Sequence, residues 1–135
     1  MTPKQIDLAA ISHAPTDVFA HVSDSDFSLA NLASLFYTQA LQALIAEADK
    51  QPDSRLQIPV RLYLDDFANL IVPDMDKTIS VTRSREISVS IVLKNITQLE
   101  GLYGRAKARP ITAHHHHLLY LGPPNVEPAA VIGAP

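Results

Sequence analysis

The chain has 135 residues, of which 47% are hydrophobic, and this composition is typical of one globular domain with a core of its own. It contains no cysteine, which excludes disulfides and thiolate metal sites and agrees with a cytoplasmic location. No uninterrupted run of about 18 or more apolar residues occurs, and the first residues lack the pattern of a signal peptide. We therefore expect neither a membrane span nor a secretory leader.

The net charge of −3 hides an asymmetry along the chain. Residues 1–76 carry 4 basic and 11 acidic side chains, whereas residues 77–109 carry 7 basic and 2 acidic ones. Such a basic block either faces phosphates or an acidic partner, or forms the solvated face of helices. On charge alone, the solvated face is the favoured interpretation.

The N-terminal half is predicted to contain a strand and a long helix. Pro3 favours a short helix that ends before Pro15, and the apolar run Asp17–Val22 is of strand type. Ser28 is a good N-cap for a helix that extends to about Lys50, with apolar residues at helical spacing along it. The segment Gln51–Ser54 then serves as its terminator.

The second half is predicted to alternate strands and helices. Strands are expected at Val60–Leu64 and Ser88–Leu93, with a short fourth strand at Leu118–Leu121. Helices are expected from Asp74 to about Arg85 and, weakened by its glycines, from Thr97 to about Ala106. This order predicts an α/β fold with three or four mostly parallel strands joined by right-handed crossovers.

Two carboxylates, Asp65 and Asp66, directly follow the apolar strand Val60–Leu64. Paired acids at the carboxyl end of a buried strand form the Walker B arrangement, in which one acid holds Mg²⁺ and the other acts on the attacking water. An acidic turn or a helix N-cap explains the same two residues equally well. The flanking sequence decides between these interpretations.

Several blocks of sequence, in this order and spacing, resemble one family: the TraG/TraD-type coupling-protein ATPases of type IV secretion and conjugative DNA transfer. The resemblance covers roughly residues 17–121 and is more specific than the two acids alone. Its blocks are Val18-Phe-Ala-His-Val-Ser-Asp-Ser-Asp26, Leu35-Phe-Tyr-Thr-Gln-Ala-Leu41, Asp65-Asp-Phe-Ala-Asn-Leu70, Ile79 to Leu93, Asn95-Ile-Thr-Gln-Leu99 and Tyr103-Gly104.

The resemblance implies roles for individual residues. Asp65 is expected to hold the Mg²⁺ of Mg-ATP, Asp66 to position the water, and Gln98 to lie near the γ-phosphate. In a ring of subunits, Arg83 or Arg85 is expected to reach a neighbour's nucleotide as an arginine finger. Asp24, which follows the predicted first strand, would share the sheet edge with these acids.

Two departures from the family pattern limit these expectations. The family usually has Asp-Glu, so Asp66 is one methylene shorter than its counterpart. More seriously, no G-x-x-x-x-G-K-[ST] loop is present, so the chain has neither the amide cradle nor the lysine that bind phosphates. We therefore expect little ATP binding or turnover by this chain alone.

The resemblance implies a truncated motor domain. Residues 17–121 correspond to the C-terminal half of a RecA-like three-layer ATPase domain, preceded by an extension at 1–16 and followed by a Pro-rich tail at 122–135. The family acts at the cytoplasmic face of the inner membrane, and its C-terminal part recognises relaxosome proteins such as TraM. The alternatives are a module that docks a relaxosome protein or joins a full-length ring, and a non-functional remnant.

Two further patterns have chemistry of their own, a run of histidines and a set of tyrosines. Four adjacent histidines, His114–His117, have the ligand chemistry of a Zn²⁺, Ni²⁺ or Cu²⁺ site, but no carboxylate or cysteine lies nearby, which favours adventitious metal affinity. Aromatic residues among basic ones are typical of nucleic-acid stacking, but here they are scattered, and core or interface packing explains them equally well. These are Tyr37, Tyr63, Tyr103 and Tyr120.

Overall fold

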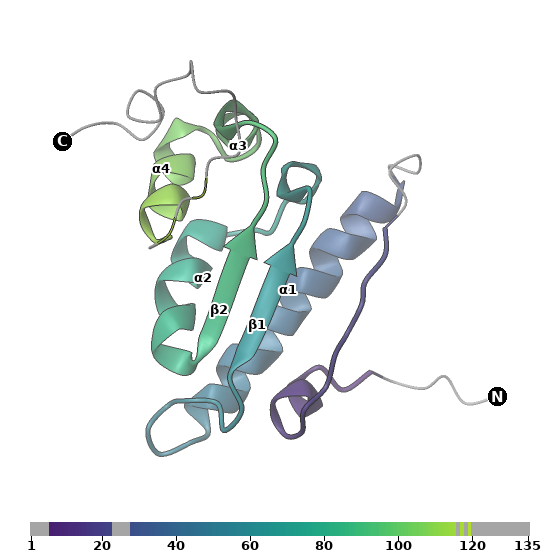
Figure 1. Cartoon of the computed structure of the whole chain (residues 1–135), viewed down its shortest axis with the longest axis vertical. Helices are drawn as coiled ribbons and strands as arrows, with labels where there is room; N and C mark the ends of the chain where they lie inside the picture. The colour runs from purple at the N-terminus through teal and green to yellow at the C-terminus, as the bar shows by residue number, and fades with distance from the viewer. Residues whose placement is uncertain (1–5, 23–27, 116, 118, 120–135) are drawn as a thin grey trace.

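The computed structural model describes residues 6–22, 28–115, 117 and 119 of the chain (Figure 1). The elements are short 3-10 helices (η), α-helices and a small parallel sheet. In chain order the elements are η1 (Ala9–Ser12), α1 (Ser28–Asp49), β1 (Val60–Leu64), η2 (Phe67–Asn69), α2 (Met75–Thr82), η3 (Arg83–Arg85), β2 (Ile87–Ile91), α3 (Ile96–Tyr103) and α4 (Arg105–Ala113).

The sheet consists of β1 and β2, which pair in parallel with Val60 opposite Ile87 and Leu64 opposite Ile91. The return connection runs through α2, as parallel pairing requires. The predicted α/β class and the predicted parallel pairing of these two segments are therefore confirmed. Among the described residues the sheet has two strands rather than three or four.

The predicted strand at Asp17–Val22 is wrong as a paired strand. The segment is extended and passes beside α1, but it has no strand pairing (Figure 1). Phe19 is 93% and Val18 49% exposed, whereas Val22 packs against the hydrophobic core. Extended backbone becomes a strand only when a neighbouring strand takes up its hydrogen bonds. The predicted fourth strand, Leu118–Leu121, falls mostly outside the described residues.

One face of the sheet is covered and the other is open. The inward side chains, such as Leu64 and Ile87, are 1% and 2% exposed, whereas Arg61, Tyr63 and Ser88 on the opposite face are exposed. The described residues therefore form two layers, and not the three layers expected. Tyr63 lies on the open face and is 71% exposed, so core packing does not account for this tyrosine.

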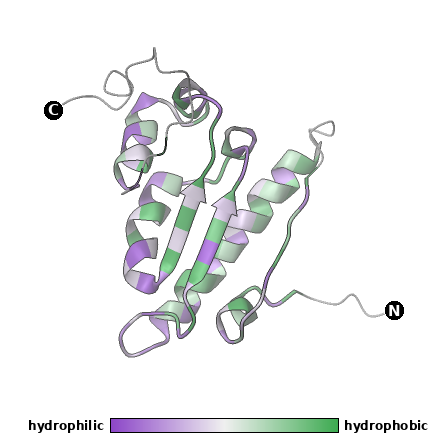
Figure 2. Cartoon of the chain, viewed as in Figure 1, coloured by the Kyte–Doolittle hydropathy of each residue, from purple (hydrophilic) through white to green (hydrophobic). Residues whose placement is uncertain are grey.

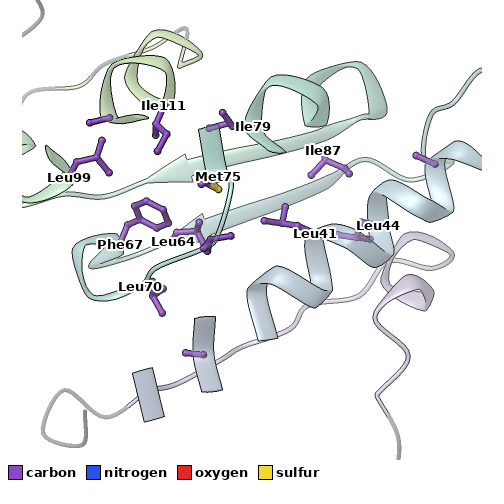
Figure 3. Packing of buried hydrophobic residues seen from close by; sticks show 14 of the residues in the cluster. Leu41, Leu44, Leu64, Phe67, Leu70, Met75, Ile79, Ile87, Leu99 and Ile111 are labelled. Carbon is purple, nitrogen blue, oxygen red and sulfur yellow. The ribbon is translucent and has the colours of Figure 1, made fainter. Parts of the chain in front are cut away.

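A single hydrophobic cluster joins the four α-helices and η2 to the covered face of the sheet (Figure 3). Burying each large aliphatic or aromatic side chain contributes about 1.5–3 kcal/mol relative to leaving it exposed. Figure 2 shows the alternation of apolar and polar residues along both strands that makes this one-sided packing possible. The cluster is centred on Leu41, Leu44, Leu64, Phe67, Met75, Ile79, Ile87, Leu99 and Ile111.

Helix α1 confirms the predicted long helix, and its C-terminal half packs on the sheet. Leu41 and Ala48 are fully buried, whereas Leu32 and Leu35 in the N-terminal half are 61% and 51% exposed. By length and composition alone, Leu29–Asp49 is apolar enough to cross a membrane, which qualifies the expectation that no segment is. The buried residues identify this half of α1 as part of the core.

The N-terminal segment is attached to α1 through Glu47. Its two carboxylate oxygens accept hydrogen bonds from Lys50 Nζ at 2.7 Å and from His13 Nε2 at 3.0 Å. These bonds, with Lys50 contributing most, hold the pKa of Glu47 below its usual value. The predicted helix over residues 3–11 is present only as η1, and residues 1–5 lie outside the described part.

The predicted helix from Asp74 to about Arg85 is present as α2 followed by η3. Ile79 and Thr82 are buried, and Lys77 and Arg83 are exposed. Asp74 precedes α2 in a left-handed conformation, but its side chain makes no capping hydrogen bond and lies near two lysines instead.

The predicted helix from Thr97 is instead two helices, α3 and α4, which meet at Gly104. Helix α4 continues through Pro110, beyond the predicted end of the helix at about Ala106. A proline inside a helix removes one hydrogen bond. Ala108 and Ile111 nevertheless hold this helix in the core, since they are 3% and 1% exposed.

The two glycines of this region are predicted to respond oppositely to alanine. Gly104 has φ +74° and ψ 154°, a conformation open essentially to glycine alone, so Gly104→Ala should destabilise the fold by about 1–3 kcal/mol. Gly101 lies inside α3 with open space around it, so Gly101→Ala should stabilise it by about 0.5–1 kcal/mol. Urea unfolding of both variants measures this difference, and the same sign for both would contradict it.

Candidate functional site

The end of β1 is fixed by two hydrogen bonds to one residue beyond β2. The N–H of Val92 donates to the Leu64 carbonyl at 3.0 Å, and the N–H of Phe67 donates to the Val92 carbonyl at 3.2 Å. Asp65 and Asp66 lie between these two bonds, at the carboxyl edge of the sheet. We call residues 65–69 the acid turn, because the two acids open it and η2 completes it.

Asp66 makes the turn sharp by taking up a left-handed conformation, with φ 47° and ψ 42°. Aspartate tolerates this conformation better than most residues. Its carboxylate pairs with the Lys94 ammonium, whose Nζ lies 3.0 Å from Oδ1 and 3.1 Å from Oδ2. The lysine side chain is 71% exposed, so this is a surface ion pair of modest strength.

The carboxylate of Asp65 folds against the backbone of the turn. Its Oδ1 accepts the N–H of Asp66 at 2.9 Å, and the residue is exposed. One side-chain oxygen thus stabilises the turn, while the other is available to a ligand. The two acids consequently differ: Asp66 is neutralised by a lysine, whereas Asp65 presents a negative charge to solvent.

Helix α3 begins at the same edge of the sheet and carries Gln98. The side chain of Asn95 caps this helix by accepting the N–H of Thr97 at 2.9 Å. The backbone carbonyl of Asn95 accepts the N–H of Gln98 at 3.1 Å. The side chain of Gln98 is exposed in the first turn. The structure thus brings Gln98 to the edge that carries both acids, as expected for ends of parallel strands.

Tyr103, at the other end of α3, contacts the segment that follows the acids. Its hydroxyl accepts the N–H of Val72 at 2.9 Å and donates to the Leu70 carbonyl at 3.3 Å. Its ring stacks on Phe67, with centroids 5.7 Å apart and planes 8° from parallel. Burial raises the pKa of this phenol, and the Val72 N–H opposes that shift, so the hydroxyl keeps the proton that it donates.

Arg85 lies at the opposite edge of the sheet. It precedes β2, and the five residues of that strand separate it from the acid turn by about 15 Å. Its guanidinium Nε and Nη2 are each 2.9 Å from Asp49 Oδ1, at the end of α1. Within this chain Arg85 therefore joins two elements of the fold, and Arg83 beside it is exposed.

The remaining sequence-predicted residues are placed in part. Asp24 and Tyr120 lie outside the described residues. His114 and His117 are exposed, and the Nδ1 of His115 lies 2.7 Å from the Ile111 carbonyl. In the described part of the chain, no three His, Cys, Asp or Glu side chains gather in a way that could hold a metal ion.

Sequence reasoning missed two residues of this site, Lys94 and Tyr103. Lys94 was grouped with the basic block, although its place just after a predicted strand puts it at the acid edge. Tyr103 was counted among scattered tyrosines. Only the three-dimensional structure shows that its hydroxyl satisfies two backbone groups 31 and 33 residues earlier in the chain.

The donor set at the acid edge fits a hard cation in part. Mg²⁺ is usually bound by one or two carboxylates together with phosphate oxygens and water. Asp65 offers an exposed carboxylate of that kind, while Asp66 would first have to leave Lys94. The edge can therefore supply carboxylates to a metal, but the described residues include no phosphate-binding loop.

The family comparison covers this site. The sequence pattern of the family described as "TraM recognition site of TraD and TraG" matches residues 59–134, which include β1, the acid turn, α2, β2, α3 and α4. Neither a curated protein nor a solved structure matches the chain. Because the matched region is more than half of the 135 residues, the chain belongs to the family of the TraM recognition site of TraD and TraG.

Proposed function

We propose that this chain is the C-terminal half of a RecA-like coupling-protein motor of conjugative DNA transfer, acting at the cytoplasmic face of the membrane. In this proposal it docks a TraM-type relaxosome protein and supplies Asp65 and Asp66 to a nucleotide site that a P-loop-bearing half completes. The single observation that carries the proposal is the family match, which begins at the entrance of β1 and includes the acid turn and α3.

The recognition surface is proposed to be the exposed basic side of α4. The match excludes α1, so the partner should contact elements after residue 58. Arg105 is 85% exposed, and Arg109 is exposed one helical turn further along α4. Two like charges at this spacing attract an acidic surface and set the orientation and rate of docking more than its affinity.

Charge reversal on α4 tests this surface. Arg105→Glu with Arg109→Glu should weaken binding of a TraM-type protein about tenfold, because the two acids would then face an acidic partner. Calorimetric titration of the full chain measures this, with Arg61→Glu on the open sheet face as matched control. Loss of binding in the Arg61 variant alone would show that the partner contacts the open sheet face and not α4. Absence of binding by the unaltered chain would reject the recognition role.

The motor role rests on the exposed carboxylate of Asp65. It lies at the carboxyl edge of a parallel sheet, where ligands of such sheets gather, and its Oδ1 is already oriented by the turn. Bound Mg²⁺ would neutralise charge on the β- and γ-phosphates. Asp65 would hold the ion, Gln98 would face the γ-phosphate, and Asp66 would orient a water once it is released from Lys94.

Removing the charge of Asp65 tests the motor role. In a complex with a P-loop-bearing partner, Asp65→Asn should lower ATP hydrolysis at least about a hundredfold, because a metal ligand is lost while the turn keeps its shape. Steady-state hydrolysis beside thermal melts measures this, with Asp53→Asn as a control acid outside the edge. The chain alone should show negligible turnover. Full activity of the Asp65 variant would leave the acids as a solvated turn.

Two substitutions of Asp66 should separate its charge from its conformation. Asparagine also tolerates the left-handed backbone, so Asp66→Asn should change the free energy of unfolding by less than about 0.5 kcal/mol. The rate of ATP hydrolysis by the complex should nevertheless fall. Asp66→Glu restores the length usual in the family and should raise the rate, although the left-handed backbone costs stability by about 0.5–1 kcal/mol. Rates and urea midpoints measure both, and equal rates would exclude Asp66 from the reaction.

A further inference from the structure

We propose that Tyr103 is a positioning residue that couples α3 to the acid turn, so that Gln98 and the two acids move as one unit. The proposal rests on the proposed function for its importance to nucleotide chemistry. The mechanical coupling itself stands on contacts within this chain, and it can be tested without nucleotide. The coupling depends on one phenol, that of Tyr103, which joins two segments far apart in sequence.

The contacts of Tyr103 are directed at backbone rather than side chains. The hydroxyl satisfies both the Val72 N–H and the Leu70 carbonyl, so it fixes the path of the chain directly after η2. Leu70 and Val72 are themselves 8% and 1% exposed, which makes a lost partner costly. The ring stacks on Phe67, which is fully buried and follows Asp66 in sequence.

Helix α3 is thus attached to residues 65–72 at both of its ends. At its start, Lys94 pairs with Asp66, and at its end Tyr103 holds Leu70 and Val72. The two attachments differ in kind, because the lysine pair is exposed whereas the tyrosine is partly buried with two hydrogen bonds and a stacked ring. We assign most of the coupling to Tyr103 on this ground.

The geometry has a consequence for a ligand at the sheet edge. A ligand that pulls on Gln98 displaces α3, and the stacked and hydrogen-bonded Tyr103 passes this displacement to Phe67 and hence to Asp66. Val92 holds the other side of the same turn through its bond to Phe67. Phe67 is therefore the residue on which the pairing with Val92 and the packing of α3 converge.

Amide hydrogen exchange of the full chain, followed by NMR, tests the coupling. Tyr103→Phe keeps the ring but removes both hydrogen bonds, and it should speed exchange about tenfold or more at Val72, Phe67 and Gln98 alike. The Val60 amide, which donates to the Glu86 carbonyl at the far edge of the sheet, should change less than twofold. Lys94→Met and the exposed control Tyr63→Phe should also change these rates less than twofold.

A reciprocal variant separates coupling from a local loss of stability. Asn95→Ala removes the cap of α3, and coupling requires that it also speed exchange at Val72, but only while Tyr103 is present. Acceleration confined to Val72, acceleration shared equally by Val60, or an unchanged Val72 rate in Asn95→Ala would each overturn the proposal. None of these outcomes depends on ATP hydrolysis, so failure of the coupling and failure of the motor role are distinguishable.

Discussion

The acid turn depends on the hydrogen bonds that Val92 makes beyond the end of β2. By donating to Leu64 and accepting from Phe67, Val92 extends the pairing of the strands, while two residues of the opposite chain stand where regular parallel pairing has one. Asp65 and Asp66 are those two residues, which is why both leave the strand alternation and project from the edge. The conformation of Asp66 follows, because the chain must return to Val92 within two residues, and a left-handed residue allows this reversal.

The one-sided sheet imposes a second constraint. Parallel sheets are ordinarily covered on both faces, but here Arg61, Tyr63 and Ser88 are exposed on one face. Stability must then come from the covered face, where Leu64, Ile87 and the helices pack into a single cluster. Figure 1 shows α3 and α4 beyond the arrowheads of the strands, so the acid edge lies next to this cluster. Among the described residues, one face of the sheet is exposed and only β1 and β2 pair, which agrees with the proposal that further structure completes the domain.

Sequence patterns predicted the elements whose pattern is set by burial. The strands Val60–Leu64 and Ser88–Leu93 and the helix from Ser28 were found within two residues, because strand alternation and helical spacing record which side faces the core. Whether Tyr63 faces the core or solvent was left open, because an apolar run does not say which face of a strand is covered. The segment Asp17–Val22 was misplaced because pairing depends on a neighbour that local sequence cannot specify. At the site, Asp65, Asp66 and Gln98 were placed at one edge by topology alone, while Lys94 and Tyr103 required the folded chain.

Charge at the acid edge is balanced internally in a way that bears on any cation it receives. The ammonium of Lys94, which follows β2, contacts both carboxylate oxygens of Asp66. A divalent ion that binds Asp66 must therefore compete with this ammonium. That ion pair is exposed, and exposed pairs are weak, so the competition favours a doubly charged ion once phosphate oxygens share its coordination. Asp65 has no such competitor within hydrogen-bonding distance among the ion pairs of the described residues, and it is therefore the acid to which a cation would bind first. The two adjacent carboxylates thus differ in their contacts, because Asp66 faces a lysine whereas Asp65 faces the backbone of the turn.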